Sequence, residues 1–188
     1  IVVIDPRFTE TSAIADEHHF IRPGSDALLL LSVLHVLEAE GRFARARREM
    51  VTGLGELAQI VRAFPPERVT SAVGIEADAI RALARAFAAA PSAVWYGRMG
   101  ISTQEFGCLS TWLVDVINVV SGNFDRVGGA MFATPAVDLA AITRLIGETG
   151  KFDRWRSRVG RLPEYNGEFP VAALADEIET PGDGQIRG

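Results

Sequence analysis

Residues 1–9, IVVIDPRFT, decide the fold expected for this chain. A run of β-branched residues is typical of a strand in a parallel sheet covered on both faces. Pro6 cannot donate a ladder hydrogen bond, so the strand ends there. Thr9 is suited to cap a short helix over residues 12–15, and a second strand is expected over residues 18–21. The order strand, helix, strand predicts an α/β domain with a short parallel sheet.

Helical periodicity dominates the chain beyond this first unit. Ser25 is expected to cap a strongly apolar helix, and Ser102 with Glu105 forms the pattern of a capping box. Residues 92–96 form another short apolar run that predicts a strand. The helices expected from apolar spacing cover residues 26–40, 54–64, 76–89, 102–120, 137–146 and 171–178.

Composition excludes several classes of protein. The formal net charge of −5 argues against a nucleic-acid partner, because phosphate binding needs a basic face. The longest apolar run, residues 27–37, is well short of the roughly 20 residues that span a bilayer. Cys108 is the single cysteine, which excludes an internal disulfide and fits a reducing compartment. We expect a cytoplasmic chain excised from a longer polypeptide, with export or membrane association through partners left open.

Three segments are candidates for ligand binding because they follow strand ends or open helices: residues 5–9, 24–26 and 97–104. Asp5 or Asp26 can accept hydrogen bonds from a guanine or from ribose hydroxyls, and Arg7 can neutralise phosphate. The same residue types are also ordinary turn and helix-start residues, so a purely structural role stays open. No glycine-rich dinucleotide or P-loop motif follows either strand.

Neither a catalytic residue nor a metal ligand is predicted. His18, His19 and His35 have no carboxylate or cysteine at ligand spacing, so we interpret them as packing or surface residues. Cys108 has no partner motif around it and is expected to be a small core residue.

Taken together, several motifs resemble the molybdopterin oxidoreductases of the dimethyl sulfoxide reductase family. The resemblance spans nearly the whole chain, and its motifs occur in the family's order and spacing. The first block comprises residues 2–11, 15–17 and 22–27, and the second comprises residues 96–104, 113–118, 122–126 and 128–132.

The resemblance implies a three-layer Rossmann-like domain over residues 1–135 that holds one molybdopterin guanine dinucleotide, followed by a helical and loop extension over residues 136–188. Met99 and Gln104 match a turn beside the pterin, although the family often places glutamine one position earlier, where this chain has Thr103. The residues implied to contact the guanosine and its phosphates are Asp5, Arg7, Thr9, Gly24, Ser25 and Asp26.

The resemblance also implies a parent enzyme similar to formate dehydrogenase or nitrate reductase. Such a parent carries bis(molybdopterin guanine dinucleotide) molybdenum, and the other domains of the parent chain are the expected partners. The family's metal-ligating residue and iron-sulfur cysteines lie outside this region, so we expect the fragment to bind no cofactor and to be inactive alone. The alternatives are a free-standing nucleotide-binding module and a protein-interaction domain, both without molybdenum.

Overall fold

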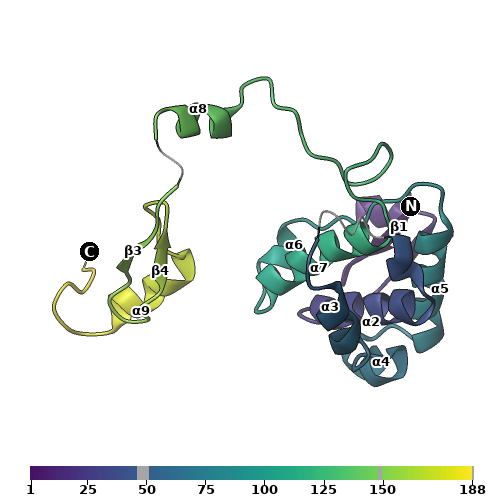
Figure 1. Ribbon diagram of the computed structural model, residues 1–188. Helices are drawn as coiled ribbons and strands as arrows, with labels where there is room; N and C mark the ends of the chain where they lie inside the picture. Colours follow the sequence, from purple (N-terminus) through teal and green to yellow (C-terminus); the bar gives the residue numbers. More distant parts are fainter. Residues whose placement is uncertain (46–50, 148–149, 188) are drawn as a thin grey trace. The chain divides into compact units, whose positions relative to one another are not determined.

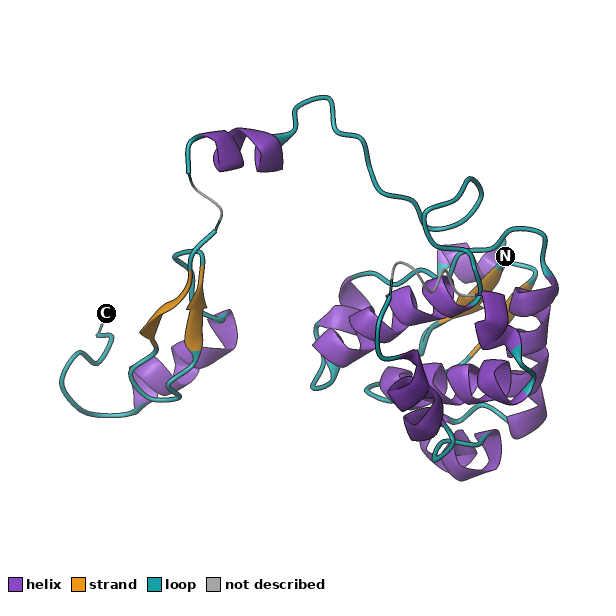
Figure 2. Cartoon of the chain, viewed as in Figure 1, coloured by secondary structure: helices purple, strands orange, loops and turns teal. Residues whose placement is uncertain are grey.

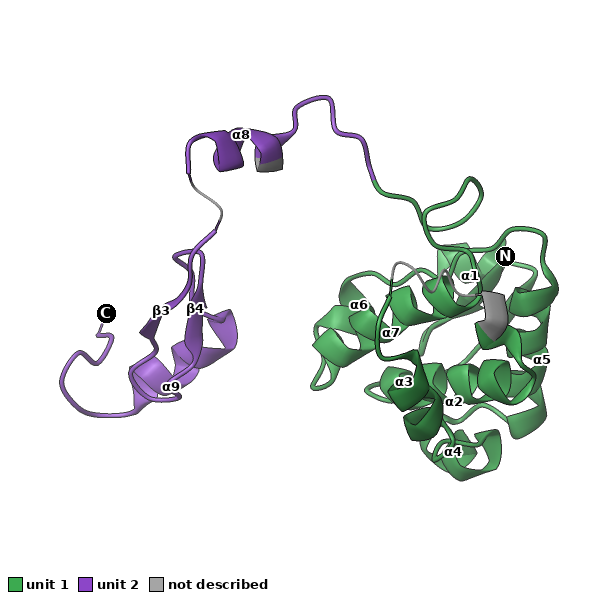
Figure 3. Cartoon of the chain, in the orientation of Figure 1, with its two compact units in different colours: residues 1–132 green, residues 133–188 purple. Residues whose placement is uncertain are grey.

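The computed structural model describes residues 1–45, 51–147 and 150–187. The chain divides into two compact units, residues 1–132 and residues 133–188 (Figure 3). Within the described ranges, no helix combines the length and the apolarity needed to cross a membrane. The functional division expected from the sequence, with a boundary after residue 135, stays a prediction.

A strand, helix, strand unit opens the first unit, as the sequence predicts (Figure 2). Strands β1 (Val2–Ile4) and β2 (Glu17–His19) pair in parallel, with Val3 opposite His18. Between them lies α1 (Glu10–Ala13), which begins two residues before the expected helix over residues 12–15. It starts directly after Thr9, whose hydroxyl caps the first turn by accepting from the Ser12 amide at 3.2 Å.

The second strand is shorter than expected. It ends at His19 instead of Ile21 because β1 stops before Pro6, and the Asp5 amide makes the last contact to the His19 carbonyl. The expected α/β class is confirmed at the level of mixed helices and strands, whereas the three-layer Rossmann-like arrangement stays a prediction.

Helix α2 (Asp26–Ala39) forms the centre of the first unit and contacts α3, α4, α5 and α7 (Figure 1). Because other helices surround it, its side chains are buried nearly all round, and Val33 and Leu34 have no exposed surface. Its neighbours are α3 (Leu54–Val61), α4 (Pro66–Val73), α5 (Ala77–Ala89) and α7 (Gly107–Val120), and the 3-10 helix η1 covers Arg42–Arg45.

Several local expectations are wrong in this unit. Cys108, expected in the core, is exposed, because it lies on the outer face of α7. The helix expected over residues 54–64 ends at Val61, and α4 follows it with Pro66 in its first turn, where the missing amide costs nothing. Residues 92–96 pair with no strand in the described chain.

The expected capping box at Ser102 and Glu105 is also absent. Ser102 ends the short helix α6 (Met99–Ser102), and α7 begins after Phe106 without a side-chain cap. The reason is close packing at the corner, since a Cβ added at Gly107 would lie 2.0 Å from the Ser102 carbonyl oxygen. The chain therefore turns between two helices instead of continuing as one.

The second unit contains α8 (Leu139–Leu145), the strands β3 (Phe152–Arg156) and β4 (Pro163–Tyr165), the 3-10 helix η3 (Val171–Ala173) and α9 (Leu174–Glu179). The antiparallel hairpin of β3 and β4 was not expected from the sequence. Every β3 residue is exposed, so the strand lacks the alternation of buried and exposed positions that identifies a strand from its sequence.

Glu164 stabilises this hairpin from within. Its buried carboxylate accepts from the Arg154 guanidinium at 2.6 Å and from the Arg154 amide at 3.1 Å, and also from the Gly167 amide. The guanidinium hydrogen bond is the main reason why the pKa of Glu164 lies below its ordinary value, against the opposing effect of burial.

We expect the hairpin to lose order on acidification. A carboxyl group with a lowered pKa stabilises the folded state above its ordinary pKa of 4.5, and this contribution disappears as the pH falls through the lower folded value. NMR contacts between the Phe152 and Tyr165 rings, which lie 4.7 Å apart, should persist near neutral pH and weaken below pH 4.5. Glu164→Gln should weaken them at neutral pH and remove the acid-dependent step; an unchanged acid transition in this variant would refute the assignment.

Candidate ligand-binding site

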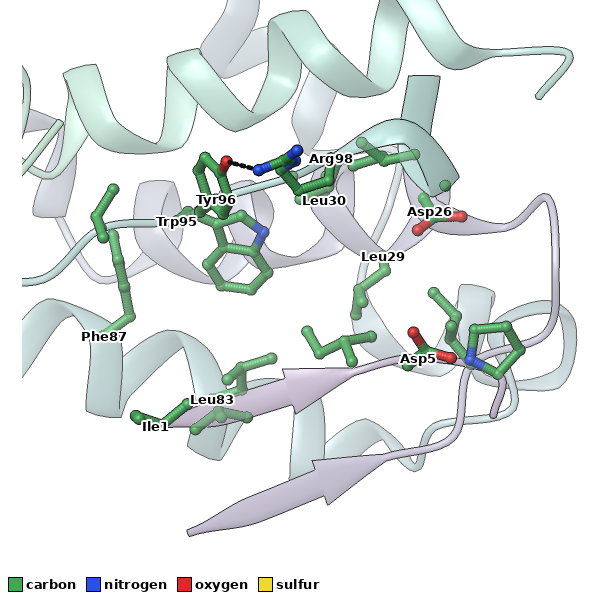
Figure 4. A pocket seen from close by; sticks show the side chains of 18 of the residues that line it. Ile1, Asp5, Asp26, Leu29, Leu30, Leu83, Phe87, Trp95, Tyr96 and Arg98 are labelled. Atoms are coloured by element: carbon green, nitrogen blue, oxygen red, sulfur yellow. Dashed lines mark hydrogen bonds between the residues drawn. The ribbon is translucent and has the colours of Figure 1, made fainter. Parts of the chain in front are cut away.

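The first unit contains a cavity of about 890 Å³ bounded by β1, α2, α5 and the segment 93–98 (Figure 4). One end is apolar and the other is polar. The apolar end includes Ile1, Leu83, Phe87 and Trp95, and the polar end lies where β1 points, with Asp5 and Asp26 facing each other across it. Three more residues that the sequence analysis proposed for the site also line the cavity, namely Arg7, Gly24 and Gln104. Arg98 lines it as well.

Asp5 lies at the polar end because it directly follows β1. Its Oδ1 accepts from the Arg7 amide at 2.8 Å, which closes a tight turn and fixes the carboxylate beside the end of the strand. The Asp5 carbonyl lies 3.1 Å from His18 Nε2, so β2 supports the same turn. Asp5 and Arg7 therefore both line this corner of the cavity.

Asp26 occupies the first turn of α2, where the helix dipole favours a carboxylate. The preceding turn requires Gly24, whose φ of +83° lies in the left-handed region. Ser25 is buried, and its hydroxyl donates to the Arg22 carbonyl at 2.6 Å. Ser25 thus holds the turn that presents Asp26, and its own side chain does not line the cavity.

Gln104 joins Asp26 from a position far along the sequence. Its Nε2 donates to Asp26 Oδ2 at 2.8 Å and to the Gly100 carbonyl at 3.0 Å. Its Oε1 is buried and has no hydrogen-bond partner in the described chain. Because a buried acceptor without a donor is costly, this oxygen is suited to meet a donor from a ligand.

Two of the other residues named from the sequence lie outside the cavity lining. Thr9 caps α1, and Met99 lies in α6 with 69% of its surface exposed. Arg98 lines the cavity but was not among the predicted site residues, and its guanidinium donates to the Tyr96 hydroxyl at 3.2 Å. The position of Arg98 in the turn predicted after residues 92–96 was the sequence signal that could have identified it.

Comparisons with known proteins match about two thirds of the chain to molybdopterin enzymes. Formate dehydrogenase H of Escherichia coli is 33% identical over 127 residues, which cover 67% of this chain and 18% of that protein. The molybdopterin-containing subunit PhsA of thiosulfate reductase from Salmonella typhimurium is 36% identical over 132 residues, covering 69% and 17%. The chain belongs to the molybdopterin oxidoreductases of the dimethyl sulfoxide reductase family.

A solved structure supports the same relationship. Acetylene hydratase from Pelobacter acetylenicus superposes with a TM-score of 0.66 at 27% identity, covering 78% of this chain and 20% of that one. No model of a protein family matches the sequence. The chain therefore spans about a fifth of the length of the molybdopterin oxidoreductases that it matches.

Proposed function

We propose that the polar end of the cavity binds the guanosine part of a molybdopterin guanine dinucleotide within a longer molybdenum oxidoreductase, and that residues 1–188 carry out no catalysis alone. The observation that supports this proposal most strongly is the shared position of Asp5, Asp26 and Gln104 at one end of one cavity. They lie at the carboxyl end of β1, where open α/β sheets bind nucleotides.

The available donors and acceptors fit a guanine. Its Watson–Crick edge presents adjacent N–H donors, and Asp26 with the unpartnered Gln104 Oε1 supplies acceptors side by side. Arg7 and Arg98 bring the positive charge that phosphates require, and Gly24 has no side chain to obstruct the approach of a ligand. When bound in the parent, the cofactor supplies the molybdenum redox chemistry, while these residues position its nucleotide end.

A substitution of Asp26 in the longer polypeptide tests this assignment. A hydrogen bond to a charged group contributes about 1.5–3 kcal/mol, so Asp26→Ala should weaken retention of the cofactor by roughly 10- to 150-fold. The measurement is the amount of GMP released by acid hydrolysis per purified polypeptide. Glu105→Ala changes an exposed carboxylate outside the cavity lining and should leave the GMP content unchanged. Equal GMP content in both variants would rule out Asp26 as a guanine ligand.

We expect the isolated 188-residue chain to bind guanine nucleotides poorly. A site completed by several domains loses both buried area and preorganisation when one part is separated. Calorimetric titration with GMP, and with extracted cofactor, should give no binding at the micromolar level. Micromolar affinity would show that the polar end is complete without the rest of the parent.

A further inference from the structure

The apolar part of the cavity has the features of a vacant strand position in a parallel sheet. Strand β1 pairs with β2 along one edge, and its other edge has no partner within the described residues. Across the cavity, the segment 93–97 runs in the same direction as β1 (Figure 4). Two extended stretches therefore face one another across an apolar space.

Residues 93–97 form the wall of the cavity opposite β1, called the far wall here. Within the described ranges, one edge of their main chain is free to pair with another strand. The Asn118 side chain bonds Trp95 on both its amide, at 2.9 Å, and its carbonyl, at 2.8 Å, as a neighbouring strand would. Successive residues of an extended chain direct their polar groups to opposite edges, so those of Val94 and Tyr96 are directed away from Asn118. Neither residue has a main-chain hydrogen bond within the described chain.

The exposure of apolar side chains on both walls also indicates an unfilled strand position between them. The β-branched composition of residues 1–4 is typical of a strand covered on both sides, yet Val2 is 41% exposed and Val94 on the opposite wall is 51% exposed. Leu29 of α2 and Leu83 of α5 also line the space between the walls. An open apolar edge of this kind is a liability unless another strand covers it.

We propose that an apolar strand of the parent polypeptide, from outside residues 1–188, inserts between β1 and residues 93–97 and pairs with both. The segment shared with this chain is 17–18% of the matched relatives' length, so a parent of similar length has ample sequence to supply a strand. The inserted strand fills the apolar part of the cavity and leaves Asp5, Asp26 and Gln104 at its polar end. The inference does not depend on which ligand that end binds.

Amide hydrogen exchange of the 188-residue chain tests strand insertion. The probe is the peptide acetyl-Lys-Val-Ile-Val-Ile-Lys-amide at millimolar concentration, and the control is the same peptide with N-methylated central amides, which is equally apolar but cannot pair. The first peptide should slow exchange at Val94 and Tyr96 at least tenfold, and the second should not. No slowing, or equal slowing by both peptides, would overturn the proposal.

Variants at the far wall identify the groups that pair. Val94→Pro removes the amide of residue 94 and should abolish the protection that the peptide gives to Tyr96. Val94→Ala keeps this amide and should retain the protection. In the longer polypeptide, Val94 and Tyr96 should be protected without any peptide. Rapid exchange there, or protection of the 188-residue chain that rises with its own concentration, would contradict insertion of a parent strand; the second result would assign the position to another copy of the chain.

Discussion

Asn118→Leu is expected to lower the free energy of unfolding of the first unit by about 3 kcal/mol, because each buried polar group left without its partner costs about 1–3 kcal/mol. Asn118 is 1% exposed and bonds the amide and the carbonyl of Trp95, and its Nδ2 also donates to the Val114 carbonyl at 3.0 Å. Leucine has a similar size but cannot replace these bonds. Urea unfolding followed by the circular dichroism of the helices measures the loss.

The same helix offers a matched control. Ser110 is fully buried in α7, and its hydroxyl has no hydrogen-bond partner in the described chain. Ser110→Ala removes a hydroxyl that makes no hydrogen bond in the described chain. The free energy of unfolding should therefore stay within about 0.5 kcal/mol of the original value or rise. If Asn118→Leu were as stable as Ser110→Ala, Asn118 would not be what fixes residues 92–96 against α7.

Leu34→Ala is expected to destabilise the first unit by about 2–5 kcal/mol, the range measured when a large core side chain leaves a cavity. Leu34 has no exposed surface and lies in α2, the helix that the surrounding helices cover. Because Asp26 occupies the first turn of α2, partial unfolding of this helix should also disturb the polar end of the cavity. Chemical denaturation of the purified variant gives the magnitude.

An exposed apolar residue provides the comparison for Leu34. Ile60 lies in α3 with 56% of its surface exposed, so Ile60→Ala removes little buried area and should change stability by no more than about 0.5 kcal/mol. Similar losses in the two variants would mean that α2 is not the centre of the core.

Local signals were sufficient for the first unit's opening and for its central helix. The β-branched residues before Pro6 predict β1, and Thr9 predicts the start of α1. Ser25 predicts the start of α2, but the expected cap is wrong, because its hydroxyl bonds no α2 amide and donates to the Arg22 carbonyl instead. Each of these signals depends only on residues that are close together in the sequence. That Asp5 and Asp26 would lie close together was also predictable, because strand ends and helix starts gather at one edge of an α/β sheet; their role in binding stays a prediction.

The remaining features depend on contacts between distant residues. Gln104 and Asp26 are 78 positions apart, and no local pattern indicates their hydrogen bond. Residues 92–96 have the composition of a strand but lack a ladder partner in the described chain, so composition alone gave the wrong prediction. The hairpin of β3 and β4 depends on the buried Glu164 and on Arg154, an ion pair that periodicity does not identify.

A density map of the longer polypeptide with its cofactor bound tests the central claim most directly. The predicted result is a guanine whose N–H edge lies within hydrogen-bond distance, about 2.7–3.2 Å, of Asp26 and Gln104, with Asp5 and Arg7 beside the same nucleotide. A guanine held by another part of the polypeptide, with Asp5 and Asp26 facing no ligand, would contradict it.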